Sequence, residues 1–318
     1  MADAMHTFDR AVIDGTGVFL TSQLEKVDPK INEPLVTYTW SRDVDLREDV
    51  SLADDVASYT TSRYSSPGNI VPNGISWAGN GSNAVAGPSV DLDRVAQPLN
   101  LWAQELSWTI RDLERSLKLG TGIDQQKLNA MKIKYNMDVD QVVYVGDSNM
   151  GVTGLVNSQN RPGVTLLSAS GPMNAATPTD ALAMVNLLCA TVYEASANTA
   201  APTQIRLPPS QFAKLAATQL PNQSGSVLGF LRQFNLSTEI NNTPVEIKPL
   251  KWLKGAGVGG TDRMLVYTKS PDRVRFPITP LDRTPVEYRS MYQLVTYYGL
   301  LGQLEIIYPE TVGYMDGI

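Results

Sequence analysis

The sequence has few of the side chains that carry out most enzyme chemistry. Its 318 residues include one cysteine, Cys189, and one histidine, His6. A single cysteine excludes an intramolecular disulfide framework and a cysteine-based metal cluster. A single histidine near the terminus leaves no rigidly held base for a serine or cysteine nucleophile, and no G-x-S-x-G motif is present. These absences argue against hydrolase and zinc-enzyme chemistry.

Long apolar runs and strong positive charge are also missing. No run approaches the roughly 20 apolar residues that span a bilayer. The first ten residues lack the basic start and apolar middle of a signal peptide, so we expect a protein of a reducing cytoplasm with no membrane partner. Charged residues make up only 18% of the chain, and the net charge is −6 with a pI near 4.9. This balance argues against specific nucleic-acid binding, which requires a basic surface.

Two glycine-rich segments resemble phosphate-binding loops but lack the neighbouring residues or the helix that such loops require. G-A-G-V-G-G at 255–260 matches the dinucleotide pattern, but a strand-like sequence, T-D-R-M-L-V-Y-T, follows it where a helix is needed. The turn at 149–157 follows a predicted strand, Val142–Val145, and lacks the lysine and hydroxyl residue of a P-loop. We interpret both as structural turns.

Acidic clusters offer no better case for catalysis or metal binding. Asp54 and Asp55, and the charged segment S-R-D-V-D-L-R-E-D at 41–49, lie where nothing in the sequence fixes two carboxyls at a set separation. The spacing of a carboxylate calcium loop is absent. The sequence therefore predicts a protein that is not an enzyme and that binds no cofactor or metal. Segment 41–49 is either a solvated edge or a docking strip, and the sequence leaves both open.

The first 97 residues predict extended structure rather than a domain. Residues 1–52 form an arm with a short amphipathic helix at Phe19–Leu24, and 53–97 form a long hairpin with turn formers at 65–74. Such a hairpin has few large apolar residues and is marginal alone in water. It is therefore either disordered or lies on another subunit. The residues we expect at inter-subunit contacts are Arg42, Asp43, Arg47, Glu48, Asp54, Asp55, Tyr59, Arg63, Tyr64 and Trp77.

The remaining chain predicts an α+β body. Residues 98–164 should hold a helix from Thr109, a second helix over Asp124–Asp138, and the strand and turn described above. Residues 165–280 should form a second lobe, with a helix from Thr177 to about Ala197 that buries Cys189. Residues 281–318 contain two strand-like runs, around 288–298 and 300–308, and are too apolar to be loose.

Several short motifs in this order resemble the major capsid proteins of tailed bacteriophages, which have the Johnson (Hong Kong 97-type) fold. The resemblance is to the capsid family without a fused scaffold domain. It covers nearly the whole chain, although each motif alone is weak. The motifs are F-L-T-S-Q-L-E at 19–25, L-x-W at 106–108, G-I-D-x-x-K-L at 122–128, V-G-D at 145–147, G-x-x-G-L-V-N at 151–157 and Y-P-E-T-V-G-Y-M-D-G-I at 308–318.

The resemblance implies an N-terminal arm (1–52), an E-loop (53–97), a P-domain with a spine helix (98–164), an A-domain (165–280) and C-terminal strands that return to this body (281–318). It implies hexamers and pentamers that form an icosahedral or prolate shell around double-stranded DNA, assembled in a bacterial cytoplasm. Its partners would be other copies of itself, a portal, and separate scaffold or decoration proteins. The alternatives are an encapsulin-type nanocompartment shell and a cofactor-binding enzyme built on 255–260.

Two departures from the resembling family bear on assembly. Some relatives crosslink their shells through an E-loop lysine, but this chain has no lysine between Lys30 and Lys118. We therefore expect no such crosslink here. The chain also begins without a long helical leader, so a scaffold would be a separate protein, absent or already removed.

Overall fold

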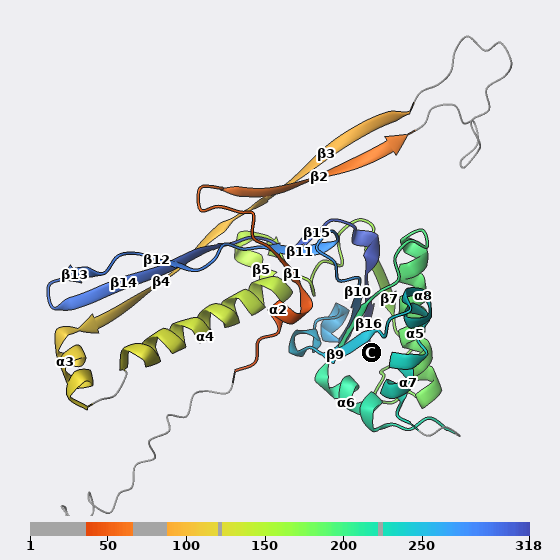
Figure 1. The fold of residues 1–318 in the computed structure, drawn as a ribbon. Coiled ribbons are helices and arrows are strands. Elements are labelled where there is room, and N and C mark those ends of the chain that lie inside the picture. Colours follow the sequence, from red (N-terminus) through yellow and green to blue (C-terminus); the bar gives the residue numbers. More distant parts are fainter. Residues whose placement is uncertain (1–35, 66–87, 120–122, 222–224) are drawn as a thin grey trace, which may run out of the picture. The chain divides into compact units, whose positions relative to one another are not determined.

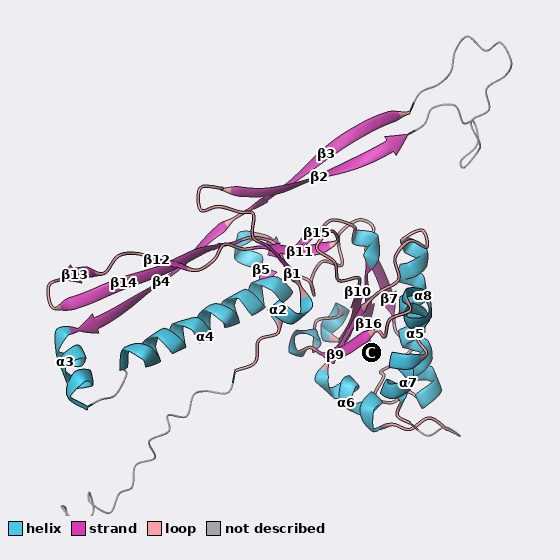
Figure 2. Ribbon diagram, viewed as in Figure 1, coloured by secondary structure: helices cyan, strands magenta, loops and turns pink. Residues whose placement is uncertain are grey.

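The fold rests on a five-stranded sheet and one long helix (Figures 1 and 2). The computed structural model describes residues 36–65, 88–119, 123–221 and 225–318. Residues 38–318 form one compact unit, and residues 1–37 are assigned to another; the account below concerns the larger unit. The predicted helix at Phe19–Leu24, the turn at 66–74 and Trp77 lie outside the described residues.

The five-stranded sheet is buried on both faces. Its order is β7 (Thr165–Ser168), β16 (Val312–Asp316), β10 (Arg263–Tyr267), β8 (Gln204–Leu207) and β9 (Glu246–Pro249). Every residue of β8, β10 and β16 is buried. The charged residues among them, Arg206, Arg263 and Asp316, form ion pairs. The C-terminal strand β16 lies between β7 and β10. The prediction that the apolar tail packs onto an earlier lobe is thereby confirmed.

Helices cover one face of this sheet and form the first core with it. They are α5 (Pro178–Ala195), α6 (Pro209–Ala217), α7 (Val227–Gln233) and α8 (Leu236–Asn241). The predicted start of α5 is confirmed, because the Thr177 side chain accepts a hydrogen bond from the Asp180 amide at 3.2 Å. Cys189 is fully buried on this helix, and burial raises the pKa of its thiol to about 11. It packs as a small apolar side chain, as predicted.

The long helix α4 (Ile123–Tyr144) carries the second core. Its 22 residues span about 33 Å at 1.5 Å per residue. The predicted strand at Val142–Val145 is wrong, because Val142–Tyr144 continue this helix. Val139 and Val143 are fully buried, so packing of one helix face outweighs the β-propensity of these valines.

A short helix and a small sheet complete the second core. They are α2 (Trp40–Asp43) and the three strands β1 (Asp45–Arg47), β11 (Val274–Pro277) and β15 (Glu305–Ile306). β1 runs parallel to β11 along its whole length. Segment 41–49 is therefore largely neither a solvated edge nor a docking strip, because it pairs inside the body.

An extended ribbon packs against α4. β4 (Asn100–Thr109) pairs antiparallel with β14 (Tyr292–Leu301) over ten residues, and β12 (Asp282–Arg283) and β13 (Glu287–Arg289) pair with β14. Leu106, Trp108 and Val295 join Met131 of α4 in a third core. Helix α3 (Ile110–Leu119) follows β4, and the Thr109 hydroxyl accepts from the Asp112 amide at 3.1 Å, as its capping pattern predicts.

The predicted second C-terminal run, 300–308, is mostly not a strand. β14 ends at Leu301, and within 302–308 only Glu305–Ile306 forms a paired strand. A Cβ at Gly302 would lie 2.5 Å from the ring of Pro277. The close approach of these two segments requires glycine and turns the chain there.

The remaining elements are a long hairpin and short turns. The hairpin pairs β2 (Val56–Ser65) with β3 (Ser89–Pro98) over ten residues, within the segment 53–97 where the sequence predicts a hairpin. The turns comprise β5 (Gly146–Asp147), β6 (Val152–Thr153) and the 3-10 helices η1 (Ser148–Met150), η2 (Lys251–Leu253), η3 (Val258–Gly260) and η4 (Pro309–Thr311). None of the helices in the described part of the chain has the length and apolarity of a bilayer span.

Candidate assembly surfaces

The base of the β2–β3 hairpin is fixed to the body. Ala57 and Gln97 are each only 3% exposed. The Tyr59 hydroxyl donates to the Ile306 carbonyl at 3.4 Å, and Arg47 donates to the Ser58 carbonyl at 3.1 Å. These contacts hold the base of β2 against β1 and β15 of the three-stranded sheet.

A buried carboxylate organises this anchor. Glu305 is fully buried, and its two oxygens accept from Arg47 at 2.7 Å and from Arg275 at 2.6 Å. Two arginines satisfy the carboxylate, which is otherwise costly to bury. Arg47 therefore joins the body and the hairpin at one point. Its guanidinium is paired with Glu305 within the same subunit.

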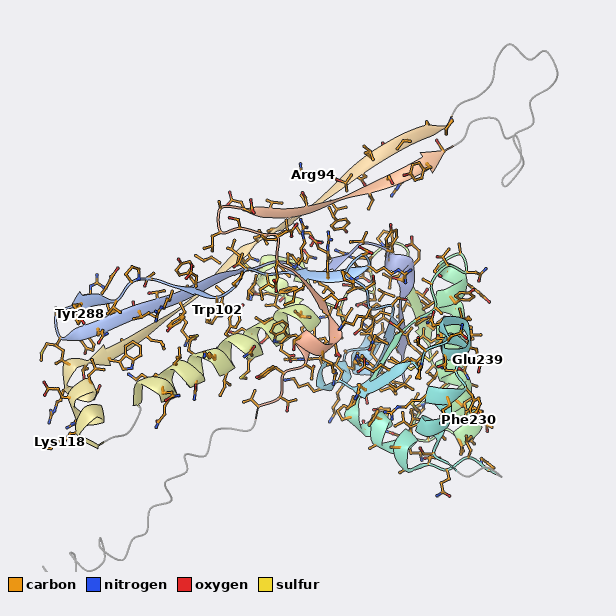
Figure 3. All side chains as sticks on the ribbon, in the orientation of Figure 1. Arg94, Trp102, Lys118, Phe230, Glu239 and Tyr288 are labelled. Carbon is orange, nitrogen blue, oxygen red and sulfur yellow. The ribbon has the colours of Figure 1, made fainter. Side chains whose placement is uncertain are left out.

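The outer half of the hairpin extends away from the rest of the described chain (Figure 3), and one of its faces carries exposed apolar side chains. Tyr64 pairs with Val90, and Ser62 pairs with Leu92. Because opposed residues share a face and successive residues alternate, Tyr64, Val90 and Leu92 lie on the same side. Their exposed fractions are 76%, 57% and 67%. We call these three residues the hairpin apolar face.

Asp43 is the main correction to the expected contact residues. It is fully buried, and its carboxylate accepts from Arg42 at 2.6 Å and Arg206 at 2.9 Å, and from the Tyr144 hydroxyl. A side chain held in this way has no surface to offer a neighbour. Asp43 instead joins α2, α4 and β8 inside the subunit.

The electrostatics of this cluster follow from burial and charge. Burial raises the pKa of Asp43, but hydrogen bonds from Arg42 and the charge of Arg206 outweigh it and hold the pKa below its usual value. Burial, together with the Asp43 charge, raises the pKa of Tyr144 far above its usual range. The cluster therefore holds an ionised carboxylate and a neutral phenol.

The other predicted contact residues divide by exposure. Those that are exposed are Glu48, Asp54, Asp55, Arg63 and Tyr64, whereas Arg42, Arg47 and Tyr59 are half-buried. Trp77 lies outside the described residues. The structure places Tyr59 and Arg63 on one face of β2 and Tyr64 on the other. It places Arg42 and Arg47 in ion pairs within the subunit.

The glycine-rich loop at 255–260 is filled by the protein's own carboxylates. The Gly255 amide donates to Asp262 at 2.9 Å, and the Val258 amide donates to Asp316 at 3.1 Å. A strand, β10, follows the loop, as predicted. These amides are therefore not available to a pyrophosphate, and they face negative charge.

The turn at 146–154 is held by close backbone contact. Gly146 has φ 77°, and a Cβ there would lie 2.2 Å from the Val152 carbonyl oxygen. A Cβ at Gly154 would lie 2.4 Å from the Tyr144 carbonyl. These two glycines serve geometry, as the structural interpretation of the turn predicted.

Other exposed apolar residues gave no signal in the sequence. Tyr288 (75%) and Met291 (66%) lie at the far end of the β13–β14 hairpin, and Leu101 (66%) lies on the outer side of β4. Strand alternation places a residue on one face or the other, but which face is covered depends on α4. That helix is distant in the sequence from β13 and β14, and α3 separates it from β4.

Comparison with known proteins identifies the family. Residues 74–318 match the family described as "Major capsid protein". A search of curated protein sequences gives no match. Among solved structures, the capsid of Myoviridae phage XM1 is similar over 93% of this chain and 98% of its own, with 17% identity and a TM-score of 0.76.

Two further structures show the same fold. The capsid of a native GTA particle matches 98% of this chain and 99% of its own, with 10% identity and a TM-score of 0.67. A virus-like particle from Pyrococcus furiosus matches 87% of this chain and 91% of its own, with 12% identity and a TM-score of 0.53. At these identities the likeness shows the fold alone. The family match and the similar tailed-phage capsids together favour a phage capsid protein over the alternative of an encapsulin-type nanocompartment shell.

A capsid shell implies self-association into capsomers and a place in the virion capsid. The family is structural, and the α+β arrangement of sheet, long helix and hairpin is that of the Hong Kong 97-type, or Johnson, fold. The chain therefore belongs to the major capsid protein family and is a shell protein of a tailed-phage capsid.

Proposed function

We propose that this subunit forms hexameric and pentameric capsomers of a phage head around double-stranded DNA, and that its β2–β3 hairpin rests on a neighbouring copy. The observation that carries the proposal is the hairpin apolar face, Tyr64, Val90 and Leu92, which is 57–76% exposed. Clustered exposed apolar residues mark interaction sites. In a capsid shell, a neighbouring subunit would cover this apolar face.

The anchored base supports this role. The base of the hairpin is buried at Ala57 and Gln97, whereas its outer half projects without cover from the described residues. A two-stranded ribbon is marginal by itself, so packing on a neighbour would stabilise it. Glu48, Asp54, Asp55 and Arg63 remain candidate polar contacts around that interface, as does Trp77.

The finer features of the shell are part of the proposal. Hexamers and pentamers arise when head-to-tail contacts close into rings, and many modest interfaces then hold the wall together. The net charge of −6 suits a container that must not trap its DNA. A portal, with separate scaffold or decoration proteins, would complete the head, and assembly would take place in the bacterial cytoplasm.

Assembly of the purified protein tests this function. We expect wild-type protein to form capsomers or shells in sedimentation and electron microscopy. The double variant Tyr64→Ser/Leu92→Ser should keep the wild-type melting temperature, because both side chains are exposed, but should assemble poorly. Thr60→Ser, an exposed polar change on the same face of the ribbon, should behave as wild type. A wild-type protein that stays monomeric under all conditions would refute the function.

A further inference from the structure

The two faces of the β2–β3 hairpin carry different side chains. The pairing register and strand alternation place Arg63, Asp91 and Asp93 together on one face. Arg63 and Asp93 line a cavity of about 560 Å³, whose other wall is formed by segments 161–163 and 306–310 of the body. This charged face is therefore turned toward the hairpin's own subunit.

The hairpin apolar face lies on the opposite side of the ribbon, together with one cation. Arg94 of β3 (Figure 3) follows Leu92 by two positions and pairs with Thr60, so it is the only charged residue of β2 and β3 on this side. Its guanidinium donates to the Ser58 hydroxyl at 3.0 and 2.8 Å. Arg94 makes no ion pair with any residue that the structure describes. This side of the hairpin therefore presents apolar side chains beside an oriented, unpaired positive charge.

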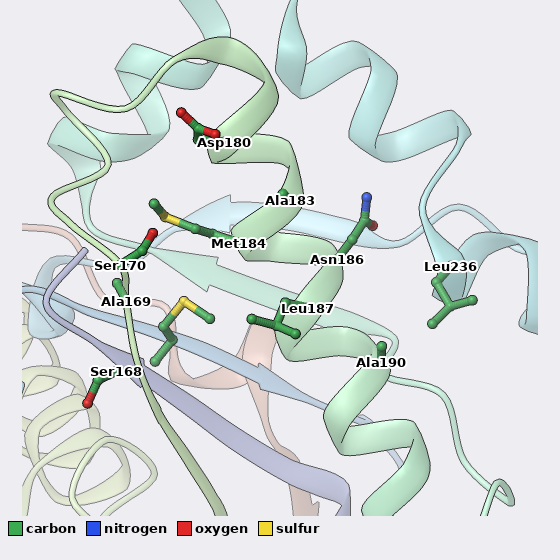
Figure 4. A pocket seen from close by; sticks show the side chains of 11 residues that line it. Ser168, Ala169, Ser170, Asp180, Ala183, Met184, Asn186, Leu187, Ala190 and Leu236 are labelled. Atoms are coloured by element: carbon green, nitrogen blue, oxygen red, sulfur yellow. The ribbon is translucent and has the colours of Figure 1, made fainter.

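A mostly apolar groove of about 690 Å³ lies along α5 (Figure 4). Leu187 of α5 and Leu236 of α8 line it and are 57% and 38% exposed. The side-chain oxygen of Asn186, which also lines the groove, is buried and has no hydrogen-bond partner in the described part of the chain. An unpaired acceptor beside exposed leucines indicates a surface that another molecule completes. We call this surface the α5 groove.

Carboxylates lie beside the leucines of the α5 groove. Glu194 follows Leu187 by seven positions on the same side of α5, and Glu239 follows Leu236 by three positions on the same side of α8. Both acids are exposed, and neither is in an ion pair within the described residues. Neither helix contains a lysine or arginine. Arg232, at the end of α7, donates to a β9 carbonyl at 3.3 Å. The groove therefore offers unpaired negative charge next to apolar side chains.

The hairpin and the groove also agree in spacing. Two positions along a strand separate Leu92 from Arg94 by about 6.6 Å. Seven positions along a helix separate Leu187 from Glu194 by about 10.5 Å. The long arginine side chain covers the remaining distance of about 4 Å. When Leu92 lies on Leu187, the guanidinium therefore reaches Glu194.

We propose that the hairpin apolar face of one subunit docks in the α5 groove of a second copy of this chain, where Arg94 pairs with Glu194 and Glu239. This inference rests on the proposed function and names the surface on which the hairpin rests. A second copy is the occupant because the hairpin supplies both the apolar side chains and the opposite charge. The base of the hairpin is fixed to the three-stranded sheet of its own subunit. The contact joins two different surfaces, and such head-to-tail contacts close into rings.

Charge reversal tests the pairing. Arg94→Glu and, separately, Glu194→Lys/Glu239→Lys should keep the wild-type melting temperature, because these side chains are exposed. Each should raise the protein concentration needed for capsomer formation by about tenfold or more, since like charges then meet in the contact. The chain with all three substitutions should regain most of the wild-type assembly, because the two surfaces are complementary again with the signs exchanged.

The control for net charge is Glu114→Lys/Asp272→Lys, which changes the charge as much as the groove variant at exposed sites outside both surfaces. It should assemble as wild type. Normal assembly of both charge-reversed variants, or no recovery when their substitutions are combined, overturns the inference.

Chemical crosslinking tests the position of the hairpin directly. The variant Leu92→Cys/Leu187→Cys, treated with a short bis-maleimide after assembly, should give a ladder of covalent oligomers that ends at five and six copies on a denaturing gel. The native Cys189 is fully buried, so wild-type protein should give no ladder. Leu92→Cys/Lys132→Cys, with its second thiol on the exposed side of α4, should also give none.

A competing position is tested in the same way. A ladder from Leu92→Cys/Leu101→Cys, with none from the groove variant, would place the hairpin on the outer side of β4 of the second copy and overturn the inference while capsomers still form. Failure of the wild type to form capsomers would instead count against the proposed function.

Discussion

Asp43 and Arg206 lie 163 positions apart in the sequence and are both fully buried. Their 2.9 Å contact joins α2, which lies within the predicted N-terminal arm, to strand β8 of the five-stranded sheet. Arg206 also donates to Gln204 and to the Glu246 carbonyl. At the scale of single residues, this pair links two segments that are far apart in the sequence.

Asp43→Asn should lower the free energy of unfolding by about 3 kcal/mol, because it leaves the Arg206 charge buried with weaker compensation. The control is Asp45→Asn, whose partly exposed pair with Lys269 spans 3.5 Å and should contribute less than about 1 kcal/mol. Urea denaturation of the unassembled subunits measures both. Equal losses in the two variants would show that the buried pair contributes no more than a surface pair.

The same variant predicts a pH dependence. The pKa of Asp43 in the folded protein lies below its usual value of 3.8. The stabilisation by this carboxylate is therefore fully present above that value and is lost as pH falls through the folded pKa. The difference in unfolding free energy between wild type and Asp43→Asn should stay constant from neutral pH to about pH 4 and shrink below it. A difference that already declines between pH 7 and 5 would contradict this assignment.

At the scale of elements, the C-terminal end of α4 and the turn that follows it are joined by backbone hydrogen bonds. The helix ends at Tyr144, whose backbone carbonyl accepts from the Val156 amide at 2.8 Å, and the Val143 carbonyl accepts from Leu155 at 2.8 Å. The chain beyond the turn therefore returns to the end of α4. Glycines at 146 and 154 make this close return possible.

Gly146→Ala should destabilise the subunit by about 3 kcal/mol, since it adds a backbone clash to a left-handed conformation. Gly151→Ala is the matched control, because its φ is 68° but a Cβ there meets nothing within 4 Å. It should cost only about 1–2 kcal/mol, the conformational penalty alone. Thermal unfolding compares the two. An equal effect would mean that the turn opens to accommodate the methyl group at 146.

At the scale of the whole molecule, the hairpin is the part whose role lies outside the subunit. Deletion of Ser65–Ala86 removes the segment between the strands and leaves a three-residue loop, 87–89, between the paired residues Tyr64 and Val90. We expect a folded subunit with a cooperative melting transition, because the three cores described above are built from other parts of the chain. Assembly should be abolished, because the contacts to a neighbour are lost.

Sedimentation and circular dichroism of the deletion variant check both parts of this prediction. Loss of the cooperative transition would show that the segment supports the subunit core. Shells formed as readily as by wild type would show that the segment is not needed for assembly. The deletion leaves the Arg47–Glu305 ion pair at the base of the hairpin in place, so this part of the subunit should fold as in the wild type.

The sequence by itself determined the order of elements and the nature of the protein. Thr177 and Thr109 specify helix starts through their own side chains, and the run at 263–268 specifies a strand through local composition, so these predictions depend on near neighbours. The scarcity of cysteine and histidine and the spaced motifs indicated a structural protein and its family.

The tertiary structure alone decided which residues are covered and which remain for partners. Val142–Tyr144 became helical because a core across the chain buries Val143 and Tyr144. Asp43 moved from the expected surface to a buried ion pair because Arg206, far along the sequence, meets it. Local sequence sets propensity, whereas burial and pairing depend on contacts that only the folded chain creates.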